Sequence, residues 1–215
     1  MMIVEEVMTT KLITISENDT LLQAQQLMVE KSVRHLPVVK KRKLLGIITE
    51  SDIRSAFIFD GRTTDLDEEV PVNPAKMKVK NYMTKEPLTV SPETNIEDAA
   101  LIIYRNKIGG LPVVKDDKLE GIISIIDMLG LFIDMMGILH GSSRIDVLTD
   151  KSQKSLDKVS KIINDHGLNI IATGIEPFPQ DDKKQICFFR VDLCETEPIV
   201  VDIEKAGFKV LDAID

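Results

Sequence analysis

Residues 46–52 read GIITESD, and residues 121–127 read GIISIID. In each stretch a glycine precedes a short apolar segment, and a hydroxyl residue then precedes an aspartate by three positions. The apolar segment predicts a short buried strand, and the hydroxyl predicts the N-cap of a helix whose first turn holds the aspartate. This helix-capping interpretation needs no ligand, so either stretch alone leaves the function open.

The two stretches belong to a long internal repeat. Residues 8–52 align without a gap with residues 83–127, and 16 of these 45 positions are identical. A repeat of this kind predicts two copies of one structural unit. Residues 59–78 between the copies contain several acidic residues and two prolines, which predicts an exposed linker rather than another element.

Both copies predict the element order β-α-β-β-α. An extended segment, residues 12–16 or 87–91, precedes a helix with an apolar stripe. The stripes consist of Leu21, Ala24, Leu27 and Met28 in the first copy and of Ile96, Ala99, Ile102 and Ile103 in the second. The pairs that predict a capping box at these helices are Thr20 with Gln23 and Asn95 with Asp98. An LPVV strand, a polar turn, the glycine stretch and a second helix follow in each copy.

Residues 143–215 predict a third unit with the order β-α-β-β-α-β. A strand at residues 144–149 precedes a helix that is closed by Gly167. Two strands around a polar turn, a helix at residues 197–205 and a last strand follow. This order predicts a four-stranded sheet with helices on one face, so the whole chain is α+β.

Composition disfavours several classes of partner. The net charge of −8 and a pI near 5.0 argue against nucleic-acid binding, which needs a basic face. Residues 1–10 lack the basic flank and apolar run of a secretory signal. The most apolar stretch, residues 122–139, contains Asp127 and Asp134, which disfavours a membrane-spanning helix. We therefore expect a cytoplasmic protein.

The residues that usually carry catalysis or bind metals are sparse. The only cysteines, Cys187 and Cys194, are expected to be reduced thiols, and their spacing matches no metal motif. The three histidines are scattered, and no Ser-His-Asp or Cys-His set is visible. We expect neither a metal site nor an enzyme.

Three sequence motifs resemble known regulatory modules. RHLPVV with GIITESD, and GGLPVV with GIISIID, each behind a VMT or YMT opening, resemble the cystathionine-β-synthase (CBS) domain. Two CBS repeats pair into a Bateman module, and the resemblance places them at residues 1–58 and 79–140. NDHGLNIIATGI resembles the ACT domain, a ferredoxin-like regulatory module, which implies an ACT domain at residues 143–215. This order of units is similar to that of acetoin-utilisation proteins.

The CBS resemblance implies a module that senses an adenosine-containing molecule such as AMP, ADP, ATP or S-adenosylmethionine. The hydroxyl-x-x-Asp motif of the family matches Thr49 with Asp52 and Ser124 with Asp127. A carboxylate accepts both ribose hydroxyls, while the hydroxyl residue and the first-turn N–H groups face the phosphate. The nucleotide is then a regulatory ligand, and no cofactor is required.

The adenine base is expected in an apolar slot beside each motif, where backbone amides meet the purine edge. The expected lining residues are Thr9, Ile13, Thr84 and Leu88 from the opening segments, with Val33 or Ile108 and Ile47 or Ile122.

The two expected sites differ in charge. Arg34 and His35 precede the first LPVV strand, whereas glycines occupy positions 109–110 before the second. The resemblance implies that these residues reach across to the phosphate of the other copy. The Asp127 site would therefore have a cationic clamp, and the Asp52 site would lack one.

Two further features predict association. The segment after Asp150 lacks the proline and glycine of the D-x-P-G-x-L motif in amino-acid-binding ACT domains, so we expect dimerisation or partner binding rather than amino-acid sensing. Residues 128–136 are more apolar than one buried helix face requires, which predicts a homodimer.

Three functions remain as hypotheses. The first is a regulator that senses an adenine nucleotide and acts on an unidentified protein partner in acetoin or central carbon metabolism. The second is an enzyme, for which the sequence offers no catalytic set. The third is a ligand-free scaffold or dimerisation protein in which the two motifs serve only as helix caps.

Overall fold

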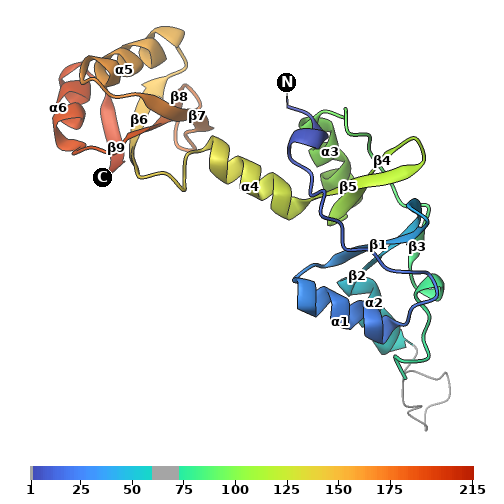
Figure 1. Cartoon of the computed structure of the whole chain (residues 1–215). Coiled ribbons are helices and arrows are strands. Elements are labelled where there is room, and N and C mark those ends of the chain that lie inside the picture. The colour runs from blue at the N-terminus through green and yellow to red at the C-terminus, as the bar shows by residue number, and fades with distance from the viewer. Residues whose placement is uncertain (1, 60–72) are drawn as a thin grey trace. The chain divides into compact units, whose positions relative to one another are not determined.

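The structure is a computed structural model that describes residues 2–59 and 73–215 (Figure 1). The chain divides into two compact units, Met1–Met128 and Leu129–Asp215. The linker expected at residues 59–78 falls mostly outside the described residues. The finer boundaries expected at residues 58, 79, 140 and 143 stay predictions.

The first unit contains both repeats, and each has a helix, a β-hairpin and a second helix. The elements of the first repeat are α1 (Leu21–Lys31), β1 (His35–Lys40), β2 (Lys43–Thr49) and α2 (Glu50–Phe59). Those of the second are α3 (Ile96–Asn106), β4 (Gly110–Lys115), β5 (Lys118–Ser124) and α4 (Ile125–Met135), of which α4 continues into the second unit. Both hairpins are antiparallel, and both shift register at the same place, between the two valines of LPVV.

The extended segments before α1 and α3 are less regular than the sequence predicts. Each contributes one isolated parallel bridge, between Ile15 and Val38 and between Val90 and Val113. Short 3-10 turns at Val4–Glu6 and Val79–Asn81 precede these segments, and Thr84–Lys85 forms the two-residue strand β3 beside β2. The order β-α-β-β-α is thus present with its first strand reduced to a bridge.

The two predicted capping boxes have different outcomes. At α1 the box is confirmed, because the Gln23 amide donates to the Thr20 hydroxyl at 3.2 Å and the Thr20 amide donates to Gln23 Oε1 at 2.8 Å. At α3 the prediction was wrong, since Asn95 makes no side-chain cap. Asn95 Nδ2 donates to Asp98 Oδ2 at 3.4 Å, and no helix N–H donates to the side-chain oxygen of Asn95.

Each repeat buries most of the helix stripe that the sequence predicts, while Leu27, Ile96 and Ile102 are only partly buried. Leu21, Ala24 and Met28 of α1 are buried with the LPVV strand of the same repeat, and Ala99 and Ile103 of α3 are buried in the same way.

Each of these cores also takes in a segment from the opening of the other repeat. Val79 lies in the core of the first repeat, and its amide donates to the Asp19 carbonyl at 2.9 Å. Val4 lies in the core of the second repeat, and its amide donates to the Thr94 carbonyl at 2.8 Å. The two opening segments are therefore exchanged between the repeats.

The second unit has the order that the sequence predicts. Its elements are β6 (Ser142–Asp150), α5 (Gln153–Asp165), β7 (Ile170–Pro177), β8 (Lys184–Asp192), α6 (Glu197–Lys205) and β9 (Lys209–Ile214). The strands form one antiparallel sheet in the order β7-β8-β6-β9. Gly167 follows α5 with a φ of +77°, as expected of a residue that ends a helix.

One face of this sheet carries the core of the second unit. Alternate residues of β6 and β8, such as Ile145 and Phe189, are buried against Val159 of α5 and Ile203 of α6. Both helices therefore cover the same face, which agrees with the predicted arrangement. The specific assignment of this unit to the ACT domain stays a prediction.

Candidate functional site

The turn from β2 into α2 holds the first hydroxyl-x-x-Asp motif in a closed hydrogen-bond arrangement. The Thr49 amide and hydroxyl donate to Asp52 Oδ2 at 2.8 and 2.7 Å. The Asp52 amide donates back to the Thr49 hydroxyl at 3.3 Å. The predicted helix cap is therefore confirmed, and it occupies one carboxylate oxygen of Asp52.

The turn from β5 into α4 repeats this arrangement. The Ser124 amide and hydroxyl donate to Asp127 Oδ2 at 2.8 and 2.6 Å, and the Asp127 amide lies 3.4 Å from the Ser124 hydroxyl. The two motifs thus place one aspartate each at the first turn of a helix with the same geometry.

The second carboxylate oxygen distinguishes the two aspartates. Asp127 Oδ1 accepts a hydrogen bond from the Thr9 hydroxyl at 3.1 Å. Thr84, the equivalent of Thr9 in the repeat, makes no such bond, and no described residue donates to Asp52 Oδ1. The free oxygen leaves Asp52 with an unused acceptor, whereas Asp127 already has a partner on each oxygen.

The exchange of the opening segments decides which of them lines which site. Thr9 pairs with Ile122 through two backbone hydrogen bonds of 2.9 and 3.1 Å, so it lies beside Asp127. Thr84 pairs with Ile47 in the β2–β3 ladder, so it lies in the strand pair that leads to Asp52. The sequence alone left this pairing open.

The remaining apolar candidates stay within their own repeats. Ile13 and Val33 pack against the core of the first repeat, and Ile108 packs against that of the second. Leu88 is 51% exposed, so its side chain is available to a ligand but is not part of a core. Whether these residues contact an adenine base stays a prediction.

The glycine that opens each stretch allows the exchanged segment to approach the strand. A Cβ atom on Gly46 would lie 2.6 Å from the Thr84 carbonyl oxygen and 2.9 Å from Met83 Sδ. A Cβ atom on Gly121 would collide with the Met8 thioether. The glycines of GIITESD and GIISIID are therefore needed for packing, independently of any ligand.

The two residues expected to form a cationic clamp have different surroundings. Arg34 is exposed, and no ion pair joins it to Asp127 in the described part of the chain. The His35 imidazole packs directly against Gly109, where any side chain would collide with it. The reach of Arg34 and His35 to a phosphate at Asp127 stays a prediction.

His35 is held in its neutral form by its surroundings. Burial lowers the pKa of His35 below its usual 6.5, and the nearby Arg34 guanidinium lowers it further, while the Asp52 carboxylate opposes both. His35 also pairs with Thr49 in the β1–β2 ladder, so it lies near the Asp52 site, which the sequence predicted to lack a cation.

Some backbone N–H groups at the starts of α2 and α4 already donate hydrogen bonds within the protein. The Glu50 amide donates to the Arg34 carbonyl at 3.1 Å, and the Ile125 amide donates to the Gly109 carbonyl at the same distance. These two bonds join each helix to the residue before the LPVV strand. They also remove one amide per site from the set expected to face a phosphate.

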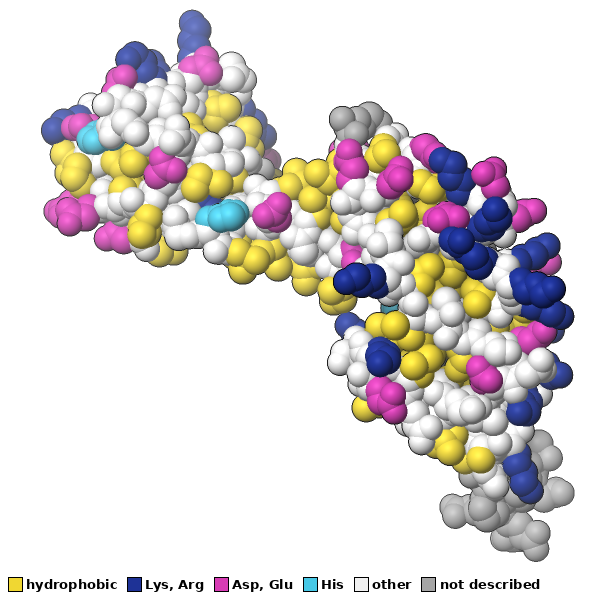
Figure 2. Space-filling view, viewed as in Figure 1, with side chains coloured by type: hydrophobic (Ala, Val, Ile, Leu, Met, Phe, Trp, Pro, Cys, Tyr) yellow, Lys and Arg dark blue, Asp and Glu magenta, His cyan; other side chains and the backbone are white. Residues whose placement is uncertain are grey.

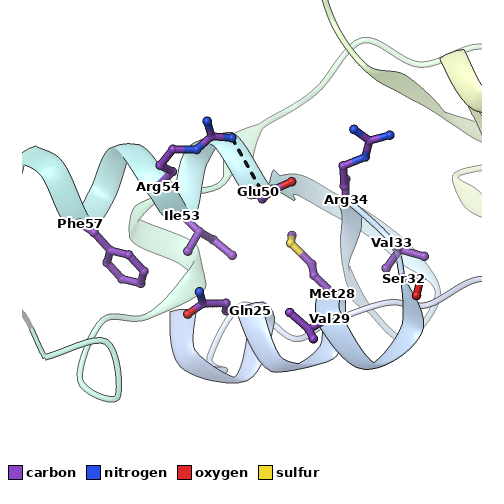
Figure 3. A pocket seen from close by; sticks show the side chains of 10 residues that line it. All are labelled: Gln25, Met28, Val29, Ser32, Val33, Arg34, Glu50, Ile53, Arg54 and Phe57. Atoms are coloured by element: carbon purple, nitrogen blue, oxygen red, sulfur yellow. Dashed lines mark ion pairs between the residues drawn. The ribbon is translucent and has the colours of Figure 1, made fainter.

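A separate hollow of about 490 Å³ lies between α1 and α2 (Figure 3). Its walls combine apolar side chains of both helices with polar ones, and Arg34 and Arg54 point to the same side of it. Thr49 and Asp52 do not line it. It is therefore not the slot that the motif predicts.

Sequence reasoning missed the roles of two methionines. Met8 and Met83 pack on the glycines of the opposite repeat. The signal was present, because they are identical and lie 75 positions apart in the repeat.

Residues 2–59 and 73–215 contain neither a membrane-spanning helix nor a cluster of metal ligands. No helix there is long and apolar enough to cross a bilayer. No group of three or more His, Cys, Asp or Glu side chains there is placed to hold a metal ion.

Two curated proteins illustrate the sequence similarity. The chain is 31% identical over 125 residues to the CBS domain-containing protein YhcV of Bacillus subtilis (strain 168), covering 58% of this chain and 81% of YhcV. It is 35% identical over 117 residues to inosine-5'-monophosphate dehydrogenase of Korarchaeum cryptofilum (strain OPF8), covering 54% of this chain. Only 21% of that enzyme is matched, so its activity is not transferred to this chain.

Three solved structures share the fold of the paired repeats. The CBS domain pair of protein MJ0100, in complex with 5'-methylthioadenosine and S-adenosyl-L-methionine, has a TM-score of 0.52 at 26% identity, covering 61% of this chain and 95% of that one. A putative acetoin utilization protein (AcuB) from Vibrio cholerae has a TM-score of 0.54 at 29% identity, covering 64% and 95%. CBSX2 in complex with AMP has a TM-score of 0.51 at 29% identity, covering 61% and 96%.

The family model for the CBS domain matches residues 4–58 and 79–134, which together make up more than half of the chain. These are the two repeats that the internal alignment identifies and that fold with the same elements. The chain therefore belongs to the CBS-domain family, and its repeats form a CBS pair.

Proposed function

We propose that this chain is a non-enzymatic regulator whose CBS pair senses an adenosine-type ligand such as AMP, ADP, ATP or S-adenosylmethionine. The proposal is supported by the family, and by solved CBS proteins of similar fold that hold AMP or S-adenosyl-L-methionine. The ligand acts by binding and no bond is made or broken.

The main support is the geometry of the two hydroxyl-x-x-Asp motifs. In each motif the cap fixes the aspartate through Oδ2, so the carboxylate is held in one orientation before any ligand arrives. Oδ1 of Asp52 is left to accept from a ribose, whereas Oδ1 of Asp127 must exchange or share the Thr9 hydroxyl. A fixed acceptor loses less conformational entropy when a diol binds.

The exchanged segments provide a route from ligand to conformation. A ligand at Asp127 would contact the Thr9 segment, and a ligand at Asp52 would contact the Thr84 segment. Each ligand would therefore touch the opening segment of one repeat and the hydroxyl-x-x-Asp motif of the other. If it binds one arrangement of the repeats more tightly than another, it shifts the population toward that arrangement.

Calorimetric titration tests this function. The full chain is titrated with AMP, ADP, ATP, S-adenosylmethionine and adenosine, and with GMP as a control for the base. We expect saturable heat from at least one adenosine compound and none after Asp52→Ala and Asp127→Ala are combined. Binding that survives the double substitution would move the site elsewhere, and steady ATP turnover would make the chain an enzyme.

A ligand-free scaffold is the second candidate, and one observation favours it. Each cap is already complete, with a hydroxyl and an amide on Asp52 Oδ2 or Asp127 Oδ2. These hydrogen bonds stabilise the helix start without a ligand. Thermal unfolding decides between the candidates, because a scaffold would show no shift in Tm with any compound of the panel.

The second unit is proposed to be an ACT-type module that associates rather than senses an amino acid. Its β-α-β-β-α-β order and its sheet order support the module. The Asp150 carboxylate supports the absence of sensing, because Oδ1 already accepts from the Ser152 amide at 3.0 Å and the Ser155 hydroxyl at 2.6 Å.

We further propose that the protein is a cytoplasmic homodimer that regulates acetoin or central carbon metabolism through a protein partner. Exposed apolar residues of α4 support association, and the likeness to a putative AcuB supports the metabolic role. Light scattering tests the homodimer, and growth of a deletion strain on acetoin tests the metabolic role. A monomer at micromolar concentration, or unchanged growth, would contradict the respective proposal.

A further inference from the structure

The carboxylate of Asp127 has fewer free hydrogen-bond positions than that of Asp52. An ionised carboxylate accepts about four hydrogen bonds, shared equally by its two oxygens. In both motifs the helix cap fills both positions on Oδ2, with an amide and a hydroxyl as donors. The Thr9 hydroxyl fills a further position on Asp127 Oδ1, whereas no described residue donates to Asp52 Oδ1. Asp52 therefore keeps two acceptor positions for a ligand, and Asp127 keeps one.

The main chain places the Thr9 hydroxyl at this position. The Thr9 amide donates to the Ile122 carbonyl at 2.9 Å, and the Ile122 amide donates to the Thr9 carbonyl at 3.1 Å. Ile122 lies two residues before Ser124, the hydroxyl residue of the cap, so this bridge puts Thr9 next to the motif. A ligand that enters the site therefore meets the Thr9 hydroxyl beside Asp127.

The equivalent threonine of the second opening segment is the direct comparison. Thr84 pairs with Ile47 in the β2–β3 ladder. Ile47 is the repeat equivalent of Ile122, and both threonines are exposed. The Thr84 hydroxyl nevertheless makes no hydrogen bond to Asp52. The two sites therefore differ by one side-chain hydrogen bond.

We propose that the Asp127 site accepts adenine nucleotides that lack one ribose hydroxyl, such as 2'-deoxy-AMP or 3'-deoxy-AMP, whereas the Asp52 site requires the complete ribose diol. The inference rests on the adenosine-sensing function proposed above and names the ligand class of each site. At the Asp52 site both ribose hydroxyls donate to the free Oδ1. At the Asp127 site one ribose hydroxyl fills the last position on Oδ1, and the other meets the Thr9 oxygen.

The Thr9 oxygen is a weaker acceptor than a carboxylate oxygen. It belongs to a neutral hydroxyl, and a hydrogen bond between neutral groups is roughly half as strong as one to an ionised group. The ribose hydroxyl that reaches Thr9 also leaves water, which offers it a neutral acceptor of similar strength. Removing this hydroxyl therefore has little effect on affinity at the Asp127 site. At the Asp52 site, removing either hydroxyl loses a hydrogen bond to a charged group.

Variants that keep one site each measure the difference. Asp52→Ala leaves the Asp127 site, and Asp127→Ala leaves the Asp52 site. Calorimetry on the full chain gives the Kd of AMP, 2'-deoxy-AMP and 3'-deoxy-AMP for each variant. In Asp127→Ala both deoxy compounds should bind more weakly than AMP by about tenfold or more. In Asp52→Ala at least one of them should bind within about threefold of AMP.

The three ligands carry the same charge, which removes long-range electrostatics from the comparison. Basic and acidic side chains lie side by side on the face of the first unit that Figure 2 shows, and Arg42 pairs there with Glu120 at 3.6 Å in the same unit. Charges of both signs act on the phosphate of any nucleotide that approaches the unit. Because the phosphate is common to the three ligands, the ratios of their Kd values report the ribose contacts.

Substituting Thr9 tests the cause of the difference. Thr9→Val removes the hydroxyl and keeps the main-chain bridge to Ile122. In the Asp52→Ala background it frees a second position on Asp127 Oδ1, so both deoxy compounds should then bind more weakly than AMP by about tenfold or more. Thr10→Val in the same background is the control, since Thr10 is exposed and its side chain bonds no described residue. The control should leave the ratios within about threefold of those of Asp52→Ala.

The possible results separate this inference from the function on which it rests. If the wild type binds AMP but Asp52→Ala discriminates against both deoxy compounds as strongly as Asp127→Ala does, the inference is overturned and the proposed function stands. A single-site variant that keeps its circular dichroism spectrum but binds no nucleotide would overturn the inference in the same way. Ratios that do not change with Thr9→Val would remove the physical basis of the inference. A wild type that gives no saturable heat with any adenosine compound would overturn both proposals.

Discussion

The Thr9 hydroxyl donates to Asp127 Oδ1 at 3.1 Å across 118 positions of the chain. Thr9 belongs to the opening of the first repeat and Asp127 to the end of the second. The carboxylate of Asp127, a candidate ribose acceptor in the second repeat, is therefore hydrogen-bonded by a residue of the first repeat. The equivalent pair, Thr84 and Asp52, makes no such bond, so the pseudo-symmetry of the repeats is broken at the site itself.

We expect Asp127→Ala to weaken AMP binding about tenfold or more, because a hydrogen bond to a charged group contributes about 1.5–3 kcal/mol. Asp52→Ala should reduce the affinity of the tightest AMP-binding step by less, since the Asp52 site is expected to lack Arg34. Calorimetry on both variants measures the difference. The assignment is wrong if Asp52→Ala removes the tight site while Asp127→Ala leaves it.

Arg34→Ala should weaken AMP while leaving adenosine nearly unchanged, because adenosine has no phosphate to lose. Arg105→Ala is the control, since Arg105 is an exposed arginine at the end of α3 that no candidate site includes. Parallel titrations with the two ligands give the comparison. Equal loss for AMP and adenosine would mean that Arg34 supports the fold and does not bind the phosphate.

Stability should fall as the pH decreases from 7 through the ordinary histidine pKa of 6.5. The pKa of His35 is lowered in the folded state, so the unfolded chain binds the proton first and acid favours unfolding. The free energy of unfolding should keep decreasing until the pH falls below the pKa of His35 in the folded protein. His35→Gln should reduce this slope in a plot of Tm against pH. An unchanged slope would show that other groups are responsible.

The two repeat glycines should differ in their tolerance of a methyl group. Gly46→Ala should cost about 1–3 kcal/mol, because its Cβ meets the Thr84 carbonyl oxygen, a backbone atom that cannot move alone. Gly121→Ala should cost less, since it meets only the flexible Met8 side chain. Urea unfolding measures both variants.

Truncated methionines provide the control for this comparison. Met8→Ala should remove most of the destabilisation caused by Gly121→Ala. Met83→Ala should leave most of the destabilisation caused by Gly46→Ala, because the Thr84 carbonyl oxygen remains. Equal relief in both double variants would contradict the backbone collision.

None of the twenty amino acids should raise the Tm of the full chain. The Asp150 carboxylate already accepts from Ser152 and Ser155, and the segment lacks a glycine for close approach of a ligand. A saturable shift with any amino acid would reverse this expectation. Ser155→Ala, which removes one of the two donors to Asp150, is the variant most suited to reveal hidden binding.

The repeat offset made most of the fold predictable. The positions of Ala24 and Ala99, and of the two LPVV strands, follow from one alignment and one helical period. The order of the second unit was equally clear, because α6 begins and ends at the residues that the sequence indicates, 197 and 205.

Other features could not be predicted from residue type alone. Asn95 has the residue type of a cap, but the neighbouring Asp98 competes for its side chain. Thr9 and Thr84 occupy equivalent positions of the repeat, each directly after a methionine, so the repeat did not indicate that only Thr9 would bond an aspartate. Their difference arises from the exchange, which pairs them with different strands.

The exchanged opening segments also order the folding of the two repeats. Val79 is fully buried in the core of the first repeat, so that core stays incomplete during synthesis until residues 77–83 have left the ribosome. Val4 is synthesised before the second repeat, so it can be buried in that core only after the second repeat has been synthesised. Neither repeat is a finished folding unit by itself, and the CBS pair should unfold in one cooperative transition rather than in two steps.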